Sequence, residues 1–132
     1  MSQTKTDMLD TPINFDTKFT VGDAEIIYTN VTELCQGCPA VGELTTNGAQ
    51  VSEKFRFGGP ALGSGTYLYA PVFVKLWSTG FKLVKIDLNS LELELIGEKK
   101  NLIFLDKIED GYAYFHEDLE KTRKSRLRIH ED

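Results

Sequence analysis

The feature that most constrains the fold is the segment FKLVKIDLNSLELELI, residues 81–96, in which apolar and polar side chains alternate. Alternation with a period of two is typical of a β-strand with one buried face. A two-residue turn at Asn89-Ser90 brings three apolar pairs onto one face of a hairpin: Leu88–Leu91, Ile86–Leu93 and Val84–Leu95. The opposite face then holds two charged pairs, Lys85–Glu94 and Asp87–Glu92. A slip of one residue would set the leucines against charges, so turn and pattern together predict one register. We expect the charged face to be open to water or close to a cation.

A second hairpin is predicted at Asn47-Gly48. Asn-Gly favours the tight turn in which both central residues have positive φ angles. Counting outward from this turn pairs Leu44 with Val51 on one face.

A third hairpin is predicted at Asp110-Gly111. A two-residue loop would pair Asp106 with Phe115, whereas a three-residue loop would pair Leu105 with Phe115. We favour the three-residue loop, with Gly111 in the left-handed conformation.

Residues 66–77, TYLYAPVFVKLW, are apolar at both alternating sets of positions, which predicts a strand buried on both faces. Pro71 interrupts this segment, and proline has no amide hydrogen to donate to a neighbouring strand. We therefore expect a bulge, a bend or a sheet edge at Pro71.

Three segments, beginning near residues 24, 66 and 101, each have the pattern of a three-stranded meander of about 40 residues. The middle one, residues 66–97, resembles a β-propeller blade, in which an extended strand is followed by a tight hairpin. The resemblance is confined to this segment, and the chain is too short for the four or more blades of a propeller. We therefore expect an all-β fold: an antiparallel meander of about eight to ten strands with blade-like three-strand units, closed as a sandwich or an irregular barrel.

The chain has 132 residues, which fits one domain. Residues 1–12 are polar and show no period, so we expect a disordered N-terminal arm followed by a single β domain over residues 13–132. Residues 117–123 are the strongest helix candidate, and a loop suits them equally well.

The net charge is −5, from 15 basic and 20 acidic residues, which argues against broad binding of nucleic acids or anionic membranes. No apolar run approaches the ~18 residues that a membrane-spanning helix needs. The first residues also lack the apolar core of a secretory signal. We expect a cytoplasmic protein that does not bind membranes.

The motif CQGCP, with Cys35 and Cys38, could suggest redox or metal chemistry. A thioredoxin-type site needs its first cysteine at a helix N-terminus, whereas here Pro39 leads into a predicted strand. Structural zinc needs four ligands, and only His116 and His130 could join the cysteines. We expect ordinary loop thiols, able to form a small disulfide, with no metal and no cofactor. Cys35 and Cys38 would be ligands only if the motif is functional.

Charge is distributed unevenly near the C-terminus. Residues 106–120 contain six acids and one base, and residues 121–128 contain five bases and no acid. Neighbouring strands could pair these charges on a wet face. A basic strip for nucleic acid is a further alternative, weakened by the lack of aromatic residues among the bases. We expect the acids to bind a basic protein partner through five side chains: Asp106, Asp110, Glu117, Asp118 and Glu120.

We expect no enzyme, because nucleophilic catalysis usually needs a histidine base beside the nucleophile and nothing pairs His116 or His130 with one. The favoured function is binding of a protein partner without catalysis, for example as an inhibitor or immunity protein that neutralises a basic toxin or enzyme. The alternative is a barrel or sandwich that binds a small apolar ligand in a pocket lined by Tyr67, Tyr69, Phe73 and Trp77.

Overall fold

The computed structural model describes residues 10–75 and 79–130, and these residues form an all-β, antiparallel fold. No helix occurs in this part of the chain. The predicted fold class is therefore confirmed. The twelve strands are β1 (Lys18–Val21), β2 (Ala24–Glu33), β3 (Ala40–Thr46), β4 (Ala49–Gln50), β5 (Arg56–Phe57), β6 (Leu62–Ser64), β7 (Tyr67–Val74), β8 (Gly80–Asp87), β9 (Leu93–Lys100), β10 (Phe104–Glu109), β11 (Tyr112–His116) and β12 (Lys124–Arg128). Twelve exceeds the expected number because β4, β5 and β6 are only two or three residues long.

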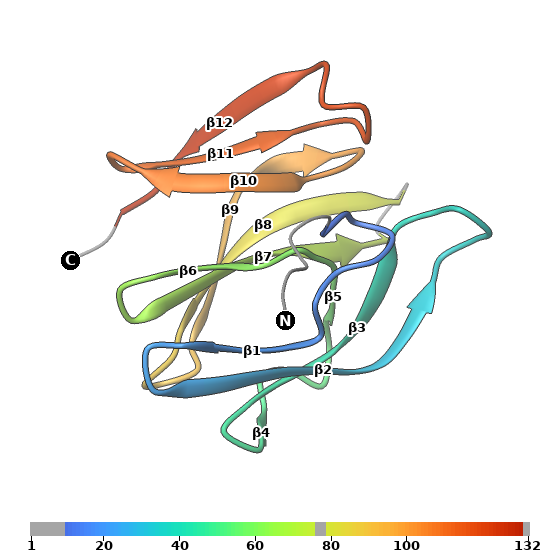
Figure 1. The fold of residues 1–132 in the computed structure, drawn as a ribbon. Helices are drawn as coiled ribbons and strands as arrows, with labels where there is room; N and C mark the ends of the chain where they lie inside the picture. Colours follow the sequence, from blue (N-terminus) through green and yellow to red (C-terminus); the bar gives the residue numbers. More distant parts are fainter. Residues whose placement is uncertain (1–9, 76–78, 131–132) are drawn as a thin grey trace, which may run out of the picture.

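The strands form one large sheet and one small sheet (Figure 1). The large sheet has the order β1-β2-β3-β5-β7-β8-β9, with β4 paired to β3 and β6 paired to β7. It does not close into a barrel, since β1 and β9 end the order without pairing to each other. The small sheet, β10-β11-β12, lies across the β7–β8 side of the large one. Of the three expected units, only the last is a separate sheet, because β5 joins the first two by pairing with both β3 and β7.

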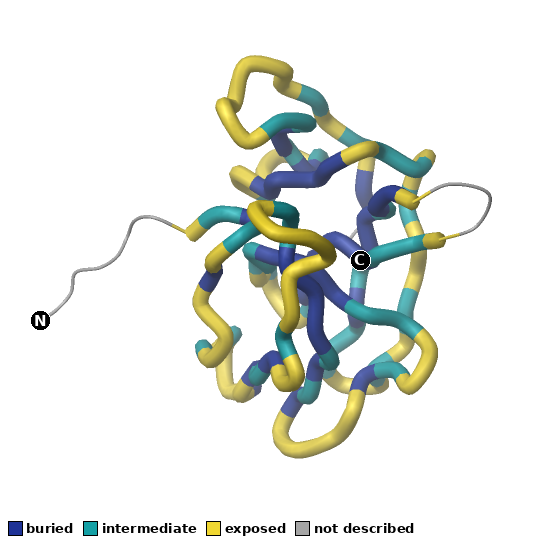
Figure 2. Tube along the Cα trace, turned by 90° about the vertical axis from the view of Figure 1, so that its right-hand side faces the viewer, coloured by how far each residue is buried: buried dark blue, intermediate teal, exposed yellow. Residues whose placement is uncertain are grey.

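Two apolar cores hold the layers together. The large sheet folds over itself, so that Ile26 and Leu44 on one side pack in the same core as Leu68, Val72 and Val84 on the other. The second core lies between the sheets and combines residues of β7 and β8 with residues of β10 and β11, among them Tyr69, Leu83, Leu105 and Phe115. Figure 2 shows the buried segments running through the middle of the molecule and the exposed loops at its periphery.

The hairpin of residues 81–96 has the predicted register. Val84 pairs with Leu95, Lys85 with Glu94, and Ile86 with Leu93. The predicted two-residue turn is wrong, because β8 ends at Asp87 and β9 begins at Leu93, so that residues 88–92 form a longer connection. The Asp87 carboxylate explains this difference: it accepts hydrogen bonds from the backbone amides of residues 89 and 90, at 2.8 and 3.2 Å.

The cation of the predicted charged face of this hairpin is Lys85. The Lys85 side chain is only 12% exposed. Its ammonium group lies 4.3 Å from the centre of the Tyr67 ring and donates a hydrogen bond to the carbonyl oxygen of His130. Lys85 therefore links the large sheet to the end of the small one.

The Asn47-Gly48 turn is confirmed. Both residues have positive φ angles, 49° and 85°. Thr46 pairs with Ala49, and the Val51 amide donates to the Leu44 carbonyl oxygen at 2.8 Å.

The Asp110-Gly111 turn confirms one part of the prediction and corrects another. Leu105 does pair with Phe115, and Gly111 has a φ of 80°. The loop nevertheless has two residues, because Glu109 pairs directly with Tyr112. A bulge at Asp106 shifts the register by one residue, which restores the Leu105–Phe115 pair and keeps both side chains in the core.

Pro71 lies inside β7, where its position avoids the loss of a ladder hydrogen bond. On one side β7 pairs along its full length with β8. On the other side it pairs first with β6, up to Tyr69, and then with β5, from Val72. Pro71 falls in the gap between these two short strands, where its carbonyl oxygen accepts from the Gly58 amide at 2.8 Å.

The described chain begins at Asp10, and residues 1–9 lie outside the described part. Pro12 is buried, and its carbonyl oxygen accepts a hydrogen bond from the Ala40 amide at 2.9 Å. Near the C-terminus, residues 117–123 form a loop between β11 and β12.

Candidate binding face on the small sheet

The outward side of the small sheet carries a group of aromatic and cationic side chains. Cross-strand neighbours in a sheet share a face, so three rows can be read from the pairing. The first row is Glu109–Tyr112–Arg128, the second Lys107–Tyr114–Arg126, and the third Phe104–His116–Lys124. The opposite side of the sheet holds Leu105, Ala113 and Phe115, which are buried in the second core. We call the three rows, together with Lys121, the outer face.

Cations lie over the aromatic rings of this face. The Arg126 guanidinium is 4.2 Å from the centre of the Tyr112 ring, and that of Arg128 is 5.7 Å from the same ring. The Lys107 ammonium lies 5.1 Å from the centre of Tyr114. These distances are within the ~6 Å over which a ring attracts a cation. The tyrosine rings therefore hold the arginine and lysine side chains in place on the sheet.

The outer face is positively charged although the chain is negative. It has five cations, Lys107, Lys121, Lys124, Arg126 and Arg128, and one carboxylate, Glu109, for a formal charge of +4. Glu109 lies 3.0 Å from the Lys107 ammonium, and this hydrogen bond raises the pKa of Lys107. The arginines and Lys124 are exposed.

His116 and Phe104 form the buried end of the outer face, and Phe104 also belongs to the second core. Phe104 contacts the His116 ring with its edge, at 6.2 Å between centres, and Lys121 lies 4.9 Å above the Phe104 ring. His116 is 8% exposed, and its Nδ1 atom has no hydrogen-bond partner among the described residues. No hydrogen bond among the described residues places a nucleophile beside Nδ1 of His116.

The five acids predicted to bind a basic partner are not brought together. Asp110 is in the β10–β11 turn, while Glu117, Asp118 and Glu120 are in the β11–β12 loop at the opposite end of the small sheet (Figure 1). Asp106 is exposed at the bulge of β10. Four of the acids therefore lie at the two ends of the small sheet, and Asp106 lies partway along β10.

Two of these acids are used within their own loop. The Asp118 carboxylate accepts hydrogen bonds from the backbone amides of Thr122, at 3.0 Å, and Arg123, at 2.9 Å, and from the Thr122 hydroxyl. The hydrogen bond from the Thr122 hydroxyl, followed by that from the Arg123 amide, lowers the pKa of Asp118. Glu117 accepts a 2.6 Å hydrogen bond from the Ser125 hydroxyl. Both carboxylates thus shape the β11–β12 connection.

The residues predicted to line an apolar pocket are also separated. Tyr69 is fully buried in the second core. Tyr67 is partly buried beneath Lys85, and Phe73 lines an open groove at the other end of β7. Trp77 lies outside the described residues. The described members of this set therefore belong to three different environments along one strand.

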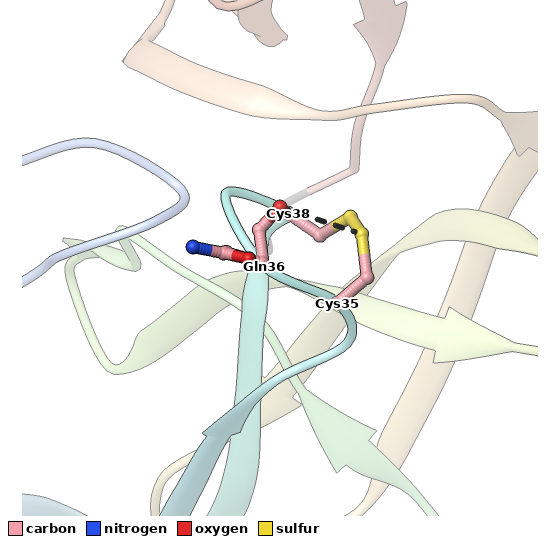
Figure 3. Close-up of a disulfide and its surroundings, with 3 residues drawn as sticks. All are labelled: Cys35, Gln36 and Cys38. Atoms are coloured by element: carbon pink, nitrogen blue, oxygen red, sulfur yellow. Dashed lines mark hydrogen bonds between the residues drawn. A yellow bond between two sulfur atoms is a disulfide. The ribbon is translucent and has the colours of Figure 1, made fainter.

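Cys35 and Cys38 form a disulfide in the loop between β2 and β3 (Figure 3). The loop is closed by hydrogen bonds from the Leu34 amide to the Pro39 carbonyl oxygen and from the Cys38 amide to the Cys35 carbonyl oxygen, each 3.0 Å. Within residues 10–75 and 79–130, no group of three or more His, Cys, Asp or Glu side chains could hold a metal ion.

The aromatic part of the outer face was not predicted. The bases of residues 121–128 have no aromatic neighbours along the chain, but Tyr112 and Tyr114 on the adjacent strand lie directly opposite Arg128 and Arg126. The signal was present as two alternating segments, YAYFH and KSRLR, on either side of a predicted loop. Pairing these segments would have revealed the face.

Comparison of the chain with protein-family models, with curated proteins and with solved structures gave no match. In the part of the chain that the structure describes, no helix is long and apolar enough to cross a membrane.

Proposed function

We propose that this protein is a non-catalytic binding domain whose outer face binds an acidic segment of a protein partner. The observation that carries the proposal is the placement of Arg126 and Arg128 over the single ring of Tyr112. The proposal keeps the predicted function class, binding of a protein partner, and reverses the predicted charge of that partner.

Tyrosine and arginine are the residues that most often dominate the energy of protein interfaces. A guanidinium that already lies on a ring has lost part of its rotational freedom, so less entropy is lost when a partner binds. Its N–H groups remain able to donate paired hydrogen bonds to a carboxylate. The outer face thus combines prearranged donors with an apolar surface beneath them.

Two observations favour an acidic protein segment over a nucleic acid. Single-stranded nucleic acids bind by stacking bases on free aromatic faces, whereas the Tyr112 ring is already contacted by Arg126 and Arg128. The chain also has a net charge of −5, which repels a long polyanion beyond the immediate surface. A short acidic segment contacts only the outer face, where the formal charge is positive.

Binding of a basic partner, such as a toxin or an enzyme that this protein would inhibit, stays a prediction supported by composition. Asp106, Asp110 and Glu120 are exposed and could contribute to it. Glu117 and Asp118 have partners within the loop. Because Asp110 and Glu120 lie at opposite ends of the small sheet, a basic partner that bound both would have to reach across the cations between them.

The test is fluorescence anisotropy with two labelled probes at several salt concentrations. The first probe is a twelve-residue peptide of alternating Glu and Asp with a central Leu-Tyr, and the second is a twelve-nucleotide oligothymidylate. The variants are Arg126→Glu on the outer face and, as a control, Lys18→Glu on β1, where the lysine side chain is 70% exposed. Both variants make the same change of charge.

The proposal expects saturable binding of the peptide that weakens at least tenfold in Arg126→Glu, falls with added salt, and changes little in Lys18→Glu. Equal weakening by the two variants would mean that binding depends on net charge alone, and would contradict the outer face as the binding site. If the oligonucleotide bound more tightly than the peptide, the inferred partner would be a nucleic acid and not a protein. If neither the peptide nor the oligonucleotide bound, the proposal would be rejected.

A further inference from the structure

A second surface, which shares no residue with the outer face, lies where the large sheet folds over itself. It is a groove of about 780 Å³ between the β4–β5 connection and the ends of β7, β8 and β9. Four apolar side chains line it: Phe55, Phe73, Val74 and Leu95. Phe55 and Val74 also pack against the first core, so the groove is a continuation of that core to the surface. Leu95 is 40% exposed, although its partner Val84 is fully buried.

The remaining described residues that line the groove are all cations: Lys54, Arg56, Lys75, Lys82 and Lys99. They come from four separate parts of the chain, so the cluster is made by the fold and is invisible as a run in the sequence. No ion pair among the described residues involves Lys54, Arg56, Lys75 or Lys82. The groove therefore concentrates positive charge around an apolar floor in a chain of net charge −5.

The position of Arg56 is fixed by the surrounding backbone. Its Nη2 atom donates to the carbonyl oxygen of Asn30 at 2.7 Å and to that of Val41 at 3.3 Å. The Lys54 ammonium lies 5.4 Å from the centre of the Phe55 ring. One cation is thus anchored and a second is drawn towards the apolar lining.

The geometry points to a binding site for a small organic anion with an extended apolar body, of which a medium-chain carboxylate is the simplest example. The volume lies within the 300 to 1,000 Å³ of ordinary small-molecule sites, which combine an apolar lining with a few polar groups that fix orientation. The apolar body would contact Phe55, Phe73 and Leu95, and the carboxylate would lie at the cations of the rim. The absence of an acid among the described lining residues excludes a cationic ligand on electrostatic grounds.

This site differs from the apolar pocket predicted from the sequence. Of the predicted residues, Phe73 alone is shown to line the groove. The cations, which were not part of the predicted pocket, define the ligand's charge. The proposal is also independent of the outer face, since the two surfaces share no residue.

The test is isothermal titration with three probes that share one apolar chain: dodecanoate, dodecanol and dodecyltrimethylammonium, each below the concentration at which it aggregates. Two variants address the two halves of the site, Lys82→Glu for the charge and Leu95→Ser for the apolar lining. The control is Lys18→Glu, a charge reversal on β1, away from the groove residues. The melting temperature of each variant shows that it is folded.

We expect dodecanoate to bind with one ligand per chain and at least tenfold more tightly than dodecanol, with no saturable binding of the cationic probe. Lys82→Glu and Leu95→Ser should each weaken dodecanoate at least tenfold, and Lys18→Glu less than twofold. Equal affinities for the three probes would show non-specific apolar adsorption and overturn the proposal. Lack of dodecanoate binding, or an equal loss in the Lys18→Glu control, would overturn it as well.

Discussion

The hydroxyl group of Tyr28 donates a 2.7 Å hydrogen bond to the carbonyl oxygen of Gly58, a residue 30 positions later in the chain. Tyr28 is 4% exposed, and its ring contacts Phe15 edge-on at 4.9 Å between centres. Gly58 is buried in the connection that follows β5. The hydrogen bond therefore ties β2 to this connection through the first core, and the carbonyl oxygen would otherwise lie unpaired away from water.

Removal of this hydroxyl should destabilise the fold. We expect Tyr28→Phe to lower the free energy of unfolding by about 1–3 kcal/mol, because a buried acceptor loses its partner. Urea denaturation followed by fluorescence measures the change. Tyr114→Phe, at a partly exposed ring on the outer face, is the control and should change stability by less than about 0.5 kcal/mol. Equal stability of the Tyr28 variant and the parent would contradict the assigned role.

The same tyrosine predicts a loss of stability at alkaline pH. Burial raises the pKa of Tyr28 above its ordinary value of 10.0. The folded state therefore retains a proton that the unfolded state releases above about pH 10. The contribution of Tyr28 is complete below that pH and decreases above it, by at most about 1.4 kcal/mol per pH unit for one proton. Denaturation between pH 9 and 11 should show a steeper loss for the parent than for Tyr28→Phe. Parallel pH profiles would refute this.

Substitution of Gly48 in the Asn47-Gly48 turn should lower stability through backbone conformation alone. Gly48 has a φ of 85°, and a Cβ placed there would meet no atom within 4 Å. Gly48→Val should therefore destabilise by about 1–3 kcal/mol through strain, since a β-branched residue disfavours positive φ. Gly48→Asn should cost less, because asparagine tolerates this conformation. If both variants melt at the same temperature as the parent, the turn has a different conformation in solution.

The parts of the fold that could be predicted are those in which turn chemistry and alternation agree. The register of residues 81–96 and the Asn47-Gly48 hairpin are of this kind. The joining of the first two units was not predictable, because β5 has only two residues and so carries no periodic pattern. The bulge at Asp106 was also hidden, since an extra residue in a strand leaves the adjacent turn unchanged.

Neither of the two proposed sites forms a continuous run in the sequence. Tyr112 and Arg126 belong to separate strands, so the aromatic neighbours of the C-terminal bases become visible only when β11 is paired with β12. Lys82 and Lys99 are brought together by the pairing of β8 with β9, and Lys54 reaches the same groove from the β4–β5 connection. Charge patterning along a chain reports such clusters only after the strand pairing is known.

The contact between the two sheets predicts that replacing Gly97 by a larger residue lowers the stability of the fold. Its φ is 78°, and a Cβ there would lie 2.7 Å from Cδ2 of Leu127 on β12. Gly65 is a matched control, with a φ of 62° and no atom within 4 Å of its Cβ position. We expect Gly65→Ala to cost about 1 kcal/mol and Gly97→Ala about 2–4 kcal/mol, because overpacking adds to backbone strain. In the Gly97→Ala background, Leu127→Ala should lower the free energy of unfolding by less than it does in the parent. If the losses of the two substitutions add, the two residues do not touch.

The acids of the small sheet differ in what they contribute to stability. Asp118→Asn should lower the melting temperature, because the carboxylate accepts hydrogen bonds from Thr122 and Arg123. The lowered pKa of Asp118 gives the sign of the pH effect: its contribution is present above the ordinary value of 3.8 and is lost as the pH falls below it. Thermal melts of the parent and Asp118→Asn should therefore converge in acid. Asp110→Asn removes the same charge from a turn position with a φ of 53°, which asparagine tolerates, and should leave the melt unchanged.

Neutralising the three exposed acids then tests which charge the partner carries. In the variant with Asp106→Asn, Asp110→Asn and Glu120→Gln, the melting temperature should stay near that of the parent, since the structure gives none of the three an ion pair. Affinity for the acidic peptide should rise by about two- to fivefold at low salt and return to the parent value at high salt, because exposed charges act over about 10 Å at 0.1 M salt. A basic probe, such as a twelve-residue lysine peptide, provides the opposite measurement. If it binds the parent more tightly than the acidic peptide does and loses that affinity in the variant, the acids are the docking surface and the outer face is not.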